Sequence, residues 1–512
     1  MALLVFLMIA AGFFRLQSAL VTNAKRAYDP LPEELMNTEQ LIAHQEYGVQ
    51  VHRVVTEDGY VLGMQRIACG RFASNCSAGR VPVLLMHGLA ASSDVWVSDL
   101  YNQSLGFILA DAGYDVWLGN CRGTSSSQDH ISLSHLDPRY WEFSWEEMSD
   151  YDLPAMVDYI RNATAAARIH YVGHSQGTLI AFAKIADNPR FAEKIDLFFA
   201  LAPVTTVGHI TTPLRLLAPF ASTIQRSLSL FGDRTLGHVS WVLGYVKPNC
   251  RQQTGWLDFC QYIIFFFAGA QDISHLDRMR MPVYLSHYPA ETSMKNIVHF
   301  SQMVQSKQLA RYDYGLMENL NHYLSFSPPT YDMSGARTKT VLFWSEQDAF
   351  ASGLDVDSLM KKLPQYVDHR LDGFSHIDFL YASPRRPRLA AAASFRQFES
   401  FHSTKAPNIV RSRVEPPSHR CQRRRQSSSL VRDGNPEQVG LPSLADPVTA
   451  LLQNDVRSLS QSTAPLSQAD DQILDEQDAK RRIYGWRKAI CASVVAEADD
   501  DDDNDDYVSM AD

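Results

Sequence analysis

Several residue types and patterns are scarce in this chain. Only 7 of its 512 residues are cysteines, too few for a small protein held together by disulfides. The net charge of −10 means that the excess of Lys and Arg typical of nucleic-acid-binding proteins is missing. The mean hydropathy of −0.20 is too low for a protein with many membrane spans. The 45% of hydrophobic residues instead predicts a large buried core.

The chain starts with the apolar run MALLVFLMIAAGFF. As a helix this run is too short to span a bilayer, and small residues follow it, so residues 1–24 are predicted to be a signal peptide cleaved after Ala19 or Ala24. The alternative is an uncleaved membrane anchor. A cleaved signal predicts entry into the secretory pathway, with an extracellular or lysosomal destination and no transmembrane anchor. Three N-x-[ST] motifs are then candidate glycosylation sites: Asn75, Asn102 and Asn162.

The C-terminal quarter differs in composition from the rest. Residues 384–432 hold 12 Lys or Arg against 2 Asp or Glu, whereas residues 499–506 read DDDDDNDD. Blocks of one charge with few aromatic residues do not bury enough apolar surface to fold. Residues 384–512 are therefore predicted to be a largely disordered, low-complexity tail. An Arg patch for acidic partners and a misassigned gene end are the alternatives.

Between these ends, strand and helix patterns alternate. Residues 51–67 carry Asp58-Gly59 between two β-type runs, which predicts a hairpin. Buried strands are then expected, with helices between them, and this alternation indicates a mostly parallel sheet covered on both faces. The expected strands are 81–88, 114–120, 169–173, 195–204, 338–345 and 366–373. The order of elements is that of the α/β-hydrolase fold.

One stretch, residues 205–335, breaks the alternation. It is aromatic and mixed, with FCQYIIFFFAGA at 259–270. Because it lies between two successive strands, it is predicted to be an inserted cap or lid over the strand ends. The predicted core therefore consists of residues 25–204 and 336–383. The aromatic residues of the insertion fit either the core of the cap or a wall that binds acyl chains.

The most informative motif is Gly173-His174-Ser175-Gln176-Gly177, a G-x-S-x-G between an apolar strand and a helix. A serine on such a sharp turn projects its hydroxyl above the sheet, as a nucleophile must. The turn is tight, so side chains larger than glycine at 173 and 177 are expected to clash. Ser175 is the predicted nucleophile, and an ordinary strand-to-helix turn is the alternative.

A serine hydroxyl needs a base, and in this fold the partners follow in the order Ser, Asp, His. His376 stands directly after the last strand and is the predicted general base. Asp348, after the strand before it, is predicted to orient the imidazole. Three other acids compete with Asp348: Glu346, Asp355 and Asp357.

The oxyanion hole of this fold is made of two backbone N–H groups. One belongs to the residue after the nucleophile, Gln176. The other comes from the loop after the third strand, where Leu89 is the predicted donor. His87 in this loop is not expected to bind a metal, because no spaced His and Asp cluster suggests one. No metal and no cofactor are predicted.

Together these residues resemble the acid lipase family of α/β-hydrolases, which includes lysosomal acid lipase and gastric lipase, and the insect members look most similar. The resemblance runs from about Asn37 to Ala382. Its marks are EYGVQVHRVVTEDGYVLGMQRI, LLMHGL, GYDVWLGNCRGT, YWEFSWEEMSDYDLPAMVDYI, YVGHSQGT, LAPV, YLSHYPAETSMKNIVHFSQ, RYDYG and PPTYD. It implies the same triad and oxyanion donors, an esterase of water-insoluble lipids such as triacylglycerols or sterol esters, and a lid in the cap.

The resemblance also implies that Cys250 pairs with Cys260, with two buried thiols as the alternative. Cys69 and Cys76 are a second candidate pair, and Cys121 is expected to be a packing residue.

Glu291 departs from the family, which favours glycine there. A second departure is that Pro384 and Pro387 would break the family's final helix, leaving an apolar flank exposed beside the histidine loop.

The predicted function is a serine lipase that acts on neutral lipids at a lipid–water interface and does not bind nucleic acid. A non-catalytic lipid carrier or yolk-type protein on the same fold is one alternative. A carboxylesterase for soluble esters is the other. The apolar stretch at 259–270 favours the lipase.

Overall fold

A computed structural model describes residues 30–73, 79–216, 218–221, 223, 276–277 and 279–381. The predicted signal peptide and the predicted C-terminal tail lie outside these residues. So do Asn75, the apolar stretch at 259–270 and the cysteine pair Cys250 and Cys260. These expectations therefore remain predictions.

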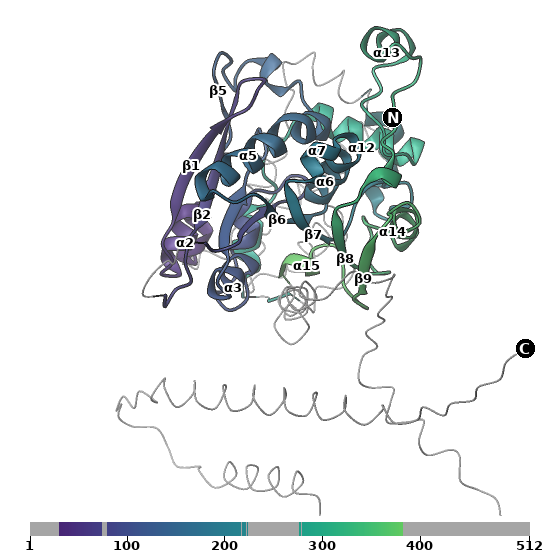
Figure 1. Cartoon of the computed structure of the whole chain (residues 1–512). Helices are drawn as coiled ribbons and strands as arrows, with labels where there is room; N and C mark the ends of the chain where they lie inside the picture. Colours follow the sequence, from purple (N-terminus) through teal and green to yellow (C-terminus); the bar gives the residue numbers. More distant parts are fainter. Residues whose placement is uncertain are drawn as a thin grey trace, which may run out of the picture. The chain divides into compact units, whose positions relative to one another are not determined.

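A nine-stranded sheet forms the centre of the described chain (Figure 1). Its strands are β1 (Gln50–Val55), β2 (Tyr60–Ile67), β3 (Pro82–Met86), β4 (Asp115–Gly119), β5 (Asp129–His130), β6 (Ile169–His174), β7 (Ile195–Leu201), β8 (Lys339–Trp344) and β9 (Tyr366–Arg370). They run in the order β1-β2-β4-β3-β6-β7-β8-β9, with β5 paired to β2. The pairs of β2 with β1, β4 and β5 are antiparallel, and the five other pairs are parallel. The predicted α/β-hydrolase sheet with its leading hairpin is confirmed.

Helices cover both faces of this sheet. The described α-helices are α2 (Thr38–His44), α3 (Leu105–Asp111), α4 (Trp145–Glu147), α5 (Leu153–Thr164), α6 (Gln176–Asp187), α7 (Pro189–Ala192), α11 (Met281–His287), α12 (Met294–Ser306), α13 (Leu316–Tyr323), α14 (Gly353–Met360) and α15 (Asp378–Tyr381). Of these, α13 lies apart from the sheet (Figure 1). In Figure 1, α5 and α6 lie on one side of the strands and α3 and α15 on the other. None of the described helices is both long and apolar enough to cross a bilayer.

The hairpin of β1 and β2 turns at Asp58-Gly59. Gly59 has φ of +96°, a conformation that costs glycine little, so the turn needs it. The Thr56 hydroxyl donates to the Asp58 carboxylate (2.6 Å) and the Thr56 N–H to the Tyr60 carbonyl (2.8 Å). The turn chemistry read from the sequence thus sets the register in which Val55 pairs with Val61.

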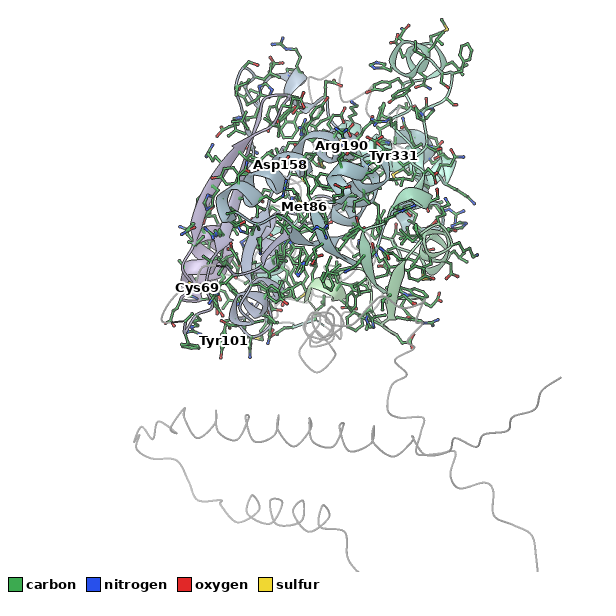
Figure 2. All side chains as sticks on the ribbon, viewed as in Figure 1. Cys69, Met86, Tyr101, Asp158, Arg190 and Tyr331 are labelled. Carbon is green, nitrogen blue, oxygen red and sulfur yellow. The ribbon has the colours of Figure 1, made fainter. Side chains whose placement is uncertain are left out.

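Alternate side chains of the central strands enter two separate cores. In β3, Leu84 and Met86 pack with α5 and α6, whereas Val83 and Leu85 pack with α3. Side chains fill the space between the layers, with Met86 near the middle (Figure 2). A strand buried on both faces carries an uninterrupted apolar run, which is why PVLLM is readable as a parallel strand.

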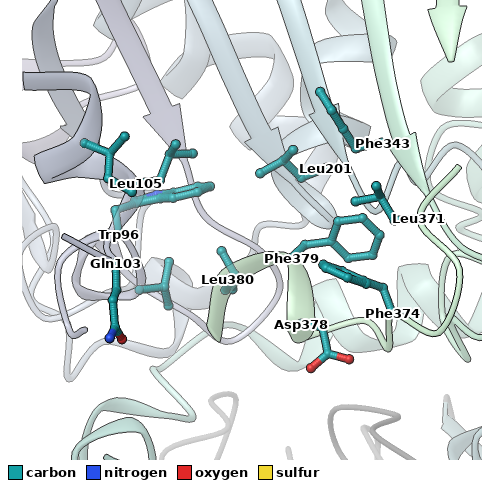
Figure 3. A pocket seen from close by; sticks show the side chains of 12 residues that line it. Trp96, Gln103, Leu105, Leu201, Phe343, Leu371, Phe374, Asp378, Phe379 and Leu380 are labelled. Carbon is teal, nitrogen blue, oxygen red and sulfur yellow. The ribbon is translucent and has the colours of Figure 1, made fainter. Parts of the chain in front are cut away.

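An apolar hollow lies beside the loop that precedes α15, on the α3 side of the sheet (Figure 3). Phe374 and Phe379 line one end of it, and Trp96 and Leu105 line the other. The exposed apolar flank predicted beside the histidine loop depends on residues after 381, which lie outside the described chain, so it stays a prediction. The lining of the hollow includes none of the three predicted triad residues, so we do not assign it to the site below.

Candidate active site

The turn between β6 and α6 holds Ser175 in a strained backbone conformation. Its φ is 53° and its ψ is −116°, outside the regions that residues with a side chain ordinarily adopt. The Ser175 N–H donates to the Leu201 carbonyl at 3.1 Å, and α6 begins at the next residue. The neighbouring strand and helix therefore keep Ser175 in this strained conformation, which directs its hydroxyl away from the sheet.

The two glycines of the motif are required by close backbone contacts. A Cβ at Gly173 would lie 2.7 Å from the carbonyl carbon of Gly177. A Cβ at Gly177 would overlap the carbonyl oxygen of Met86 and lie 2.9 Å from that of His87. The first turn of α6 is thus pressed directly against the end of β3.

Replacing Gly177 by alanine is expected to destabilise the protein by about 3 kcal/mol or more, because backbone atoms on both sides must move. Chemical denaturation of the variant measures this loss. Gly335→Ala is the matched control, since a Cβ there would have no heavy atom within 4 Å. Equal stability of the two variants would contradict the packing described for the turn.

Three predicted site residues meet at the ends of β6, β8 and β9. The Nε2 of His376 lies 2.8 Å from the Ser175 Oγ, although the two residues are 201 positions apart. Its Nδ1 lies 2.9 and 3.0 Å from the two carboxylate oxygens of Asp348. A carboxylate only accepts, so Nδ1 carries the proton and Nε2 is free to accept the serine proton. All three side chains are buried.

The carboxylate of Asp348 is itself held in place. Its Oδ1 accepts hydrogen bonds from the N–H groups of Phe350 and Ala351, both at 2.8 Å. The ring of Phe350 also packs against the imidazole of His376, with centroids 5.1 Å apart. The loop after β8 therefore fixes both the acid and one face of the base.

The competing acids have other partners or point elsewhere. Glu346 pairs with Arg370 at 3.1 Å. Asp355 accepts from the Thr206 hydroxyl (2.8 Å) and from the N–H of His209 (2.9 Å). Asp357 is exposed on α14. Of the four candidates, Asp348 is the one that the structure brings to His376.

The loop that carries His376 is anchored on both sides. The carboxylate of Asp378, at the start of α15, accepts from the N–H and the hydroxyl of Ser375 at 2.7 and 2.8 Å. The Nε2 of His174, directly before the nucleophile, lies 3.0 Å from the carbonyl oxygen of His376 and donates to it. The serine turn and the histidine loop are thus connected by a hydrogen bond to the His376 backbone as well as by the contact between the Ser175 and His376 side chains.

The two predicted oxyanion donors lie in adjoining loops. A Cβ at Gly88 would lie only 3.2 Å from the Cβ of Ser175, so the loop after β3 passes beside the serine. Within the described residues, neither the N–H of Leu89 nor that of Gln176 donates a hydrogen bond to a backbone carbonyl. His87 braces this loop: its Nδ1 donates to the Gly88 carbonyl (2.9 Å) and its Nε2 accepts from the Cys121 N–H (3.1 Å).

Three fully buried histidines stay neutral in the folded protein. Burial lowers the pKa of His87 to about 4 and that of His174 and His299 to about 3. Because these groups have an unfolded pKa near 6.5, the unfolded chain takes up their protons first on acidification. Each therefore stabilises the fold fully above about pH 6.5 and loses that contribution as the pH falls toward its folded value.

The free energy of unfolding should accordingly fall from pH 7 to pH 5, by roughly 2 kcal/mol for His299 alone. Replacing His299 by glutamine, which does not titrate, should flatten the pH dependence by that amount in urea denaturation at a series of pH values. His135→Gln, at an exposed position, is the control. An unchanged slope in the His299 variant would show that this histidine is not buried as described.

A charge cluster around the buried Arg122 is not predicted by the sequence. The guanidinium of Arg122 bonds Asp152 (2.8 Å from Nε) and Asp58 (2.6 and 2.9 Å) and lies over the ring of Tyr60. Burial alone would lower the pKa of Arg122, but the two carboxylates together outweigh it, so the pKa lies above its ordinary value. The partners lie 64 and 30 positions away, at no spacing that sequence periodicity reveals.

The remaining residues predicted from the sequence lie outside the triad. The side chains of Asn102 and Asn162 are exposed, and Asn162 lies in the last turn of α5. Cys121 is a buried free cysteine, and Cys69 is disulfide-bonded. Glu291 is half-buried, burial raises its pKa, and Gln128 donates to it at 2.8 Å. In the described part of the chain, no group of three or more His, Cys, Asp or Glu residues could hold a metal ion.

Two family descriptions match the chain. "Partial alpha/beta-hydrolase lipase region" matches residues 38–100, and "alpha/beta hydrolase fold" matches residues 81–225.

Known proteins align over most of their own length. Lipase member K of Mus musculus is 40% identical over 350 residues, which cover 68% of this chain and 87% of the relative. Gastric triacylglycerol lipase of Bos taurus is 38% identical over 69% of this chain and 88% of the relative. Lysosomal acid lipase/cholesteryl ester hydrolase of Macaca fascicularis is 36% identical over 68% of this chain and 88% of the relative. Likeness to the insect members stays a prediction. The chain thus belongs to the acid lipase family of α/β-hydrolases and is a carboxylic ester hydrolase.

Proposed function

We propose that this chain is a serine lipase that hydrolyses neutral lipids, triacylglycerols first and sterol esters as a second class, through an acyl-enzyme on Ser175. One observation carries the proposal: the hydrogen-bonded series from Ser175 Oγ through His376 to Asp348. The substrate class rests on the relatives, two of which are named for triacylglycerols and cholesteryl esters.

In the first half-reaction, Ser175 Oγ attacks the ester carbonyl carbon as its proton passes to His376 Nε2. The carbonyl π electrons move onto oxygen, and the N–H groups of Leu89 and Gln176 stabilise that anion. Asp348 stabilises the imidazolium formed next to it. As the carbonyl re-forms, the bond to the alcohol oxygen breaks, and His376 gives its proton to the leaving alcohol. The acyl group stays on Ser175.

In the second half-reaction, His376 takes a proton from a water molecule that attacks the acyl carbon. The same two N–H groups stabilise the second anion. When it collapses, the bond to Ser175 Oγ breaks, the serine recovers its proton from His376, and the fatty acid leaves.

The proposal also covers the domain organisation of the chain and its cellular destination. The described α12 of the predicted insertion, residues 205–335, reaches Gln176 through Asn296, which supports a cap over the carboxyl ends of the strands. The chain enters the secretory pathway and acts outside the cell or in the lysosome, as the names of its relatives suggest. The exposed Asn102 and Asn162 are then glycosylated.

The full chain should hydrolyse an emulsion of long-chain triacylglycerol, triolein, and do so faster than a dissolved short-chain ester when rates are compared from pH 4 to pH 8. Activity confined to the dissolved ester would favour a carboxylesterase. Binding of triolein without hydrolysis of either substrate would favour the lipid-carrier alternative.

A further inference from the structure

The insertion between β7 and β8 contacts both sides of the proposed oxyanion hole through one short segment. We call residues 288–296 the clamp segment. It runs from the end of α11 into the first turn of α12. Three of its hydrogen bonds go to the loop after β3 and to the start of α6, the two places from which the oxyanion donors come.

The first side of the clamp holds the loop after β3. The N–H of Ala290 donates to the carbonyl of Ala90 at 2.7 Å, and the hydroxyl of Tyr288 donates to the carbonyl of Leu89 at 3.3 Å. Ala90 has φ of 52°, a conformation that is unfavourable for alanine. These bonds therefore hold a strained loop in the position that directs the Leu89 N–H.

The second side of the clamp holds the residue after the nucleophile. Asn296 is completely buried, and its Oδ1 accepts from the Trp145 N–H at 2.9 Å. That bond fixes the orientation of the amide, so Nδ2 is the donor that reaches the Gln176 Oε1 at 2.8 Å. The same Nδ2 lies 3.1 Å from the Thr292 hydroxyl, which completes its two donor bonds.

We propose that Asn296 is a positioning residue for ester hydrolysis, which acts through the Gln176 side chain to hold the Gln176 N–H where the oxyanion forms. The proposal rests on the proposed function. Oxyanion donors stabilise a transition state only when they are already in place, and a displacement of about 1 Å can cost about a hundredfold in rate. Because the clamp segment belongs to the insertion, we expect the Gln176 N–H to be correctly placed only when the insertion is folded.

Kinetics of the full chain on a dissolved short-chain ester test this role, because no lipid surface enters the measurement. Asn296→Ala should lower kcat by about tenfold, less than the loss of a whole donor, and leave KM within about twofold. Gln176→Ala removes the other end of the same bond and should lower kcat equally. The double variant should fall no further than either single variant.

Asn319→Ala is the matched control. Asn319 is also buried, and its hydrogen bonds stay within residues 313–326. It should lose stability but keep kcat within about twofold.

The proposal is overturned if Asn296→Ala keeps its kcat, or if Asn319→Ala loses as much. Should Asn296→Ala fail to fold, Gln176→Ala decides alone: a tenfold lower kcat supports the proposal and an unchanged kcat overturns it. Failure of the proposed function itself would look different, because Ser175→Ala would then keep the wild-type rate.

Discussion

Replacing Ser175 by alanine should lower ester hydrolysis by about 10⁴- to 10⁶-fold while leaving the protein folded. The Oγ of Ser175 lies 2.8 Å from the His376 Nε2, to which it gives its proton. Without it no acyl-enzyme forms, and only unassisted attack by water remains. Steady-state rates on a dissolved ester and on a triolein emulsion measure the loss.

Ser149→Ala is the control for this variant. Ser149 is also fully buried, and its hydroxyl donates to the Ile180 carbonyl at 2.9 Å, away from the histidine. It should lose some stability and keep its rate. Hydrolysis by Ser175→Ala at a substantial fraction of the wild-type rate would mean that another residue is the nucleophile.

Replacing Asp348 by asparagine should lower kcat by about 10³- to 10⁴-fold. The N–H groups of Phe350 and Ala351 require an oxygen at the Oδ1 position, so the new NH₂ group takes the place of Oδ2. There it faces the Nδ1 of His376 as a second donor. The imidazole must then move its proton to Nε2, where it can no longer accept the serine proton.

Asp355→Asn is the matched control, because Asp355 is equally buried and hydrogen-bonded but to Thr206 and His209. Its variant should be less stable and nearly as active as the wild type when folded. The comparison is made as kcat on a dissolved ester at a pH where both variants are folded. If Asp355→Asn lost more activity than Asp348→Asn, the orienting acid would have been assigned to the wrong residue.

Local signals explain why much of the fold was predictable. The run PVLLM, the Asp58-Gly59 turn and the strand before Ser175 each carry their structure in consecutive residues. The strand order then limits where partners of the serine lie, since parallel strands end at one edge of a sheet. His376 and Asp348 were predicted in this way because each lies in the loop that follows a strand.

Other features depend on tertiary packing and leave no local signal. The two-residue strand β5 is too short to show a period, and it exists because the chain returns to β2. Nothing near Asn296 in the sequence indicates that it reaches Gln176, 120 positions away. The cluster around Arg122 likewise joins separate segments of the chain.

A single activated serine does the chemistry in the proposed mechanism, and reaction with a fluorophosphonate probe tests for that serine. The probe phosphonylates a serine only when a neighbouring base takes its proton. In the folded full chain, peptide mapping by mass spectrometry should find one adduct, on Ser175, and the adduct should disappear in unfolded protein and in Asp348→Asn. A folded wild-type chain that carries no adduct, or carries it on another residue, would contradict the account.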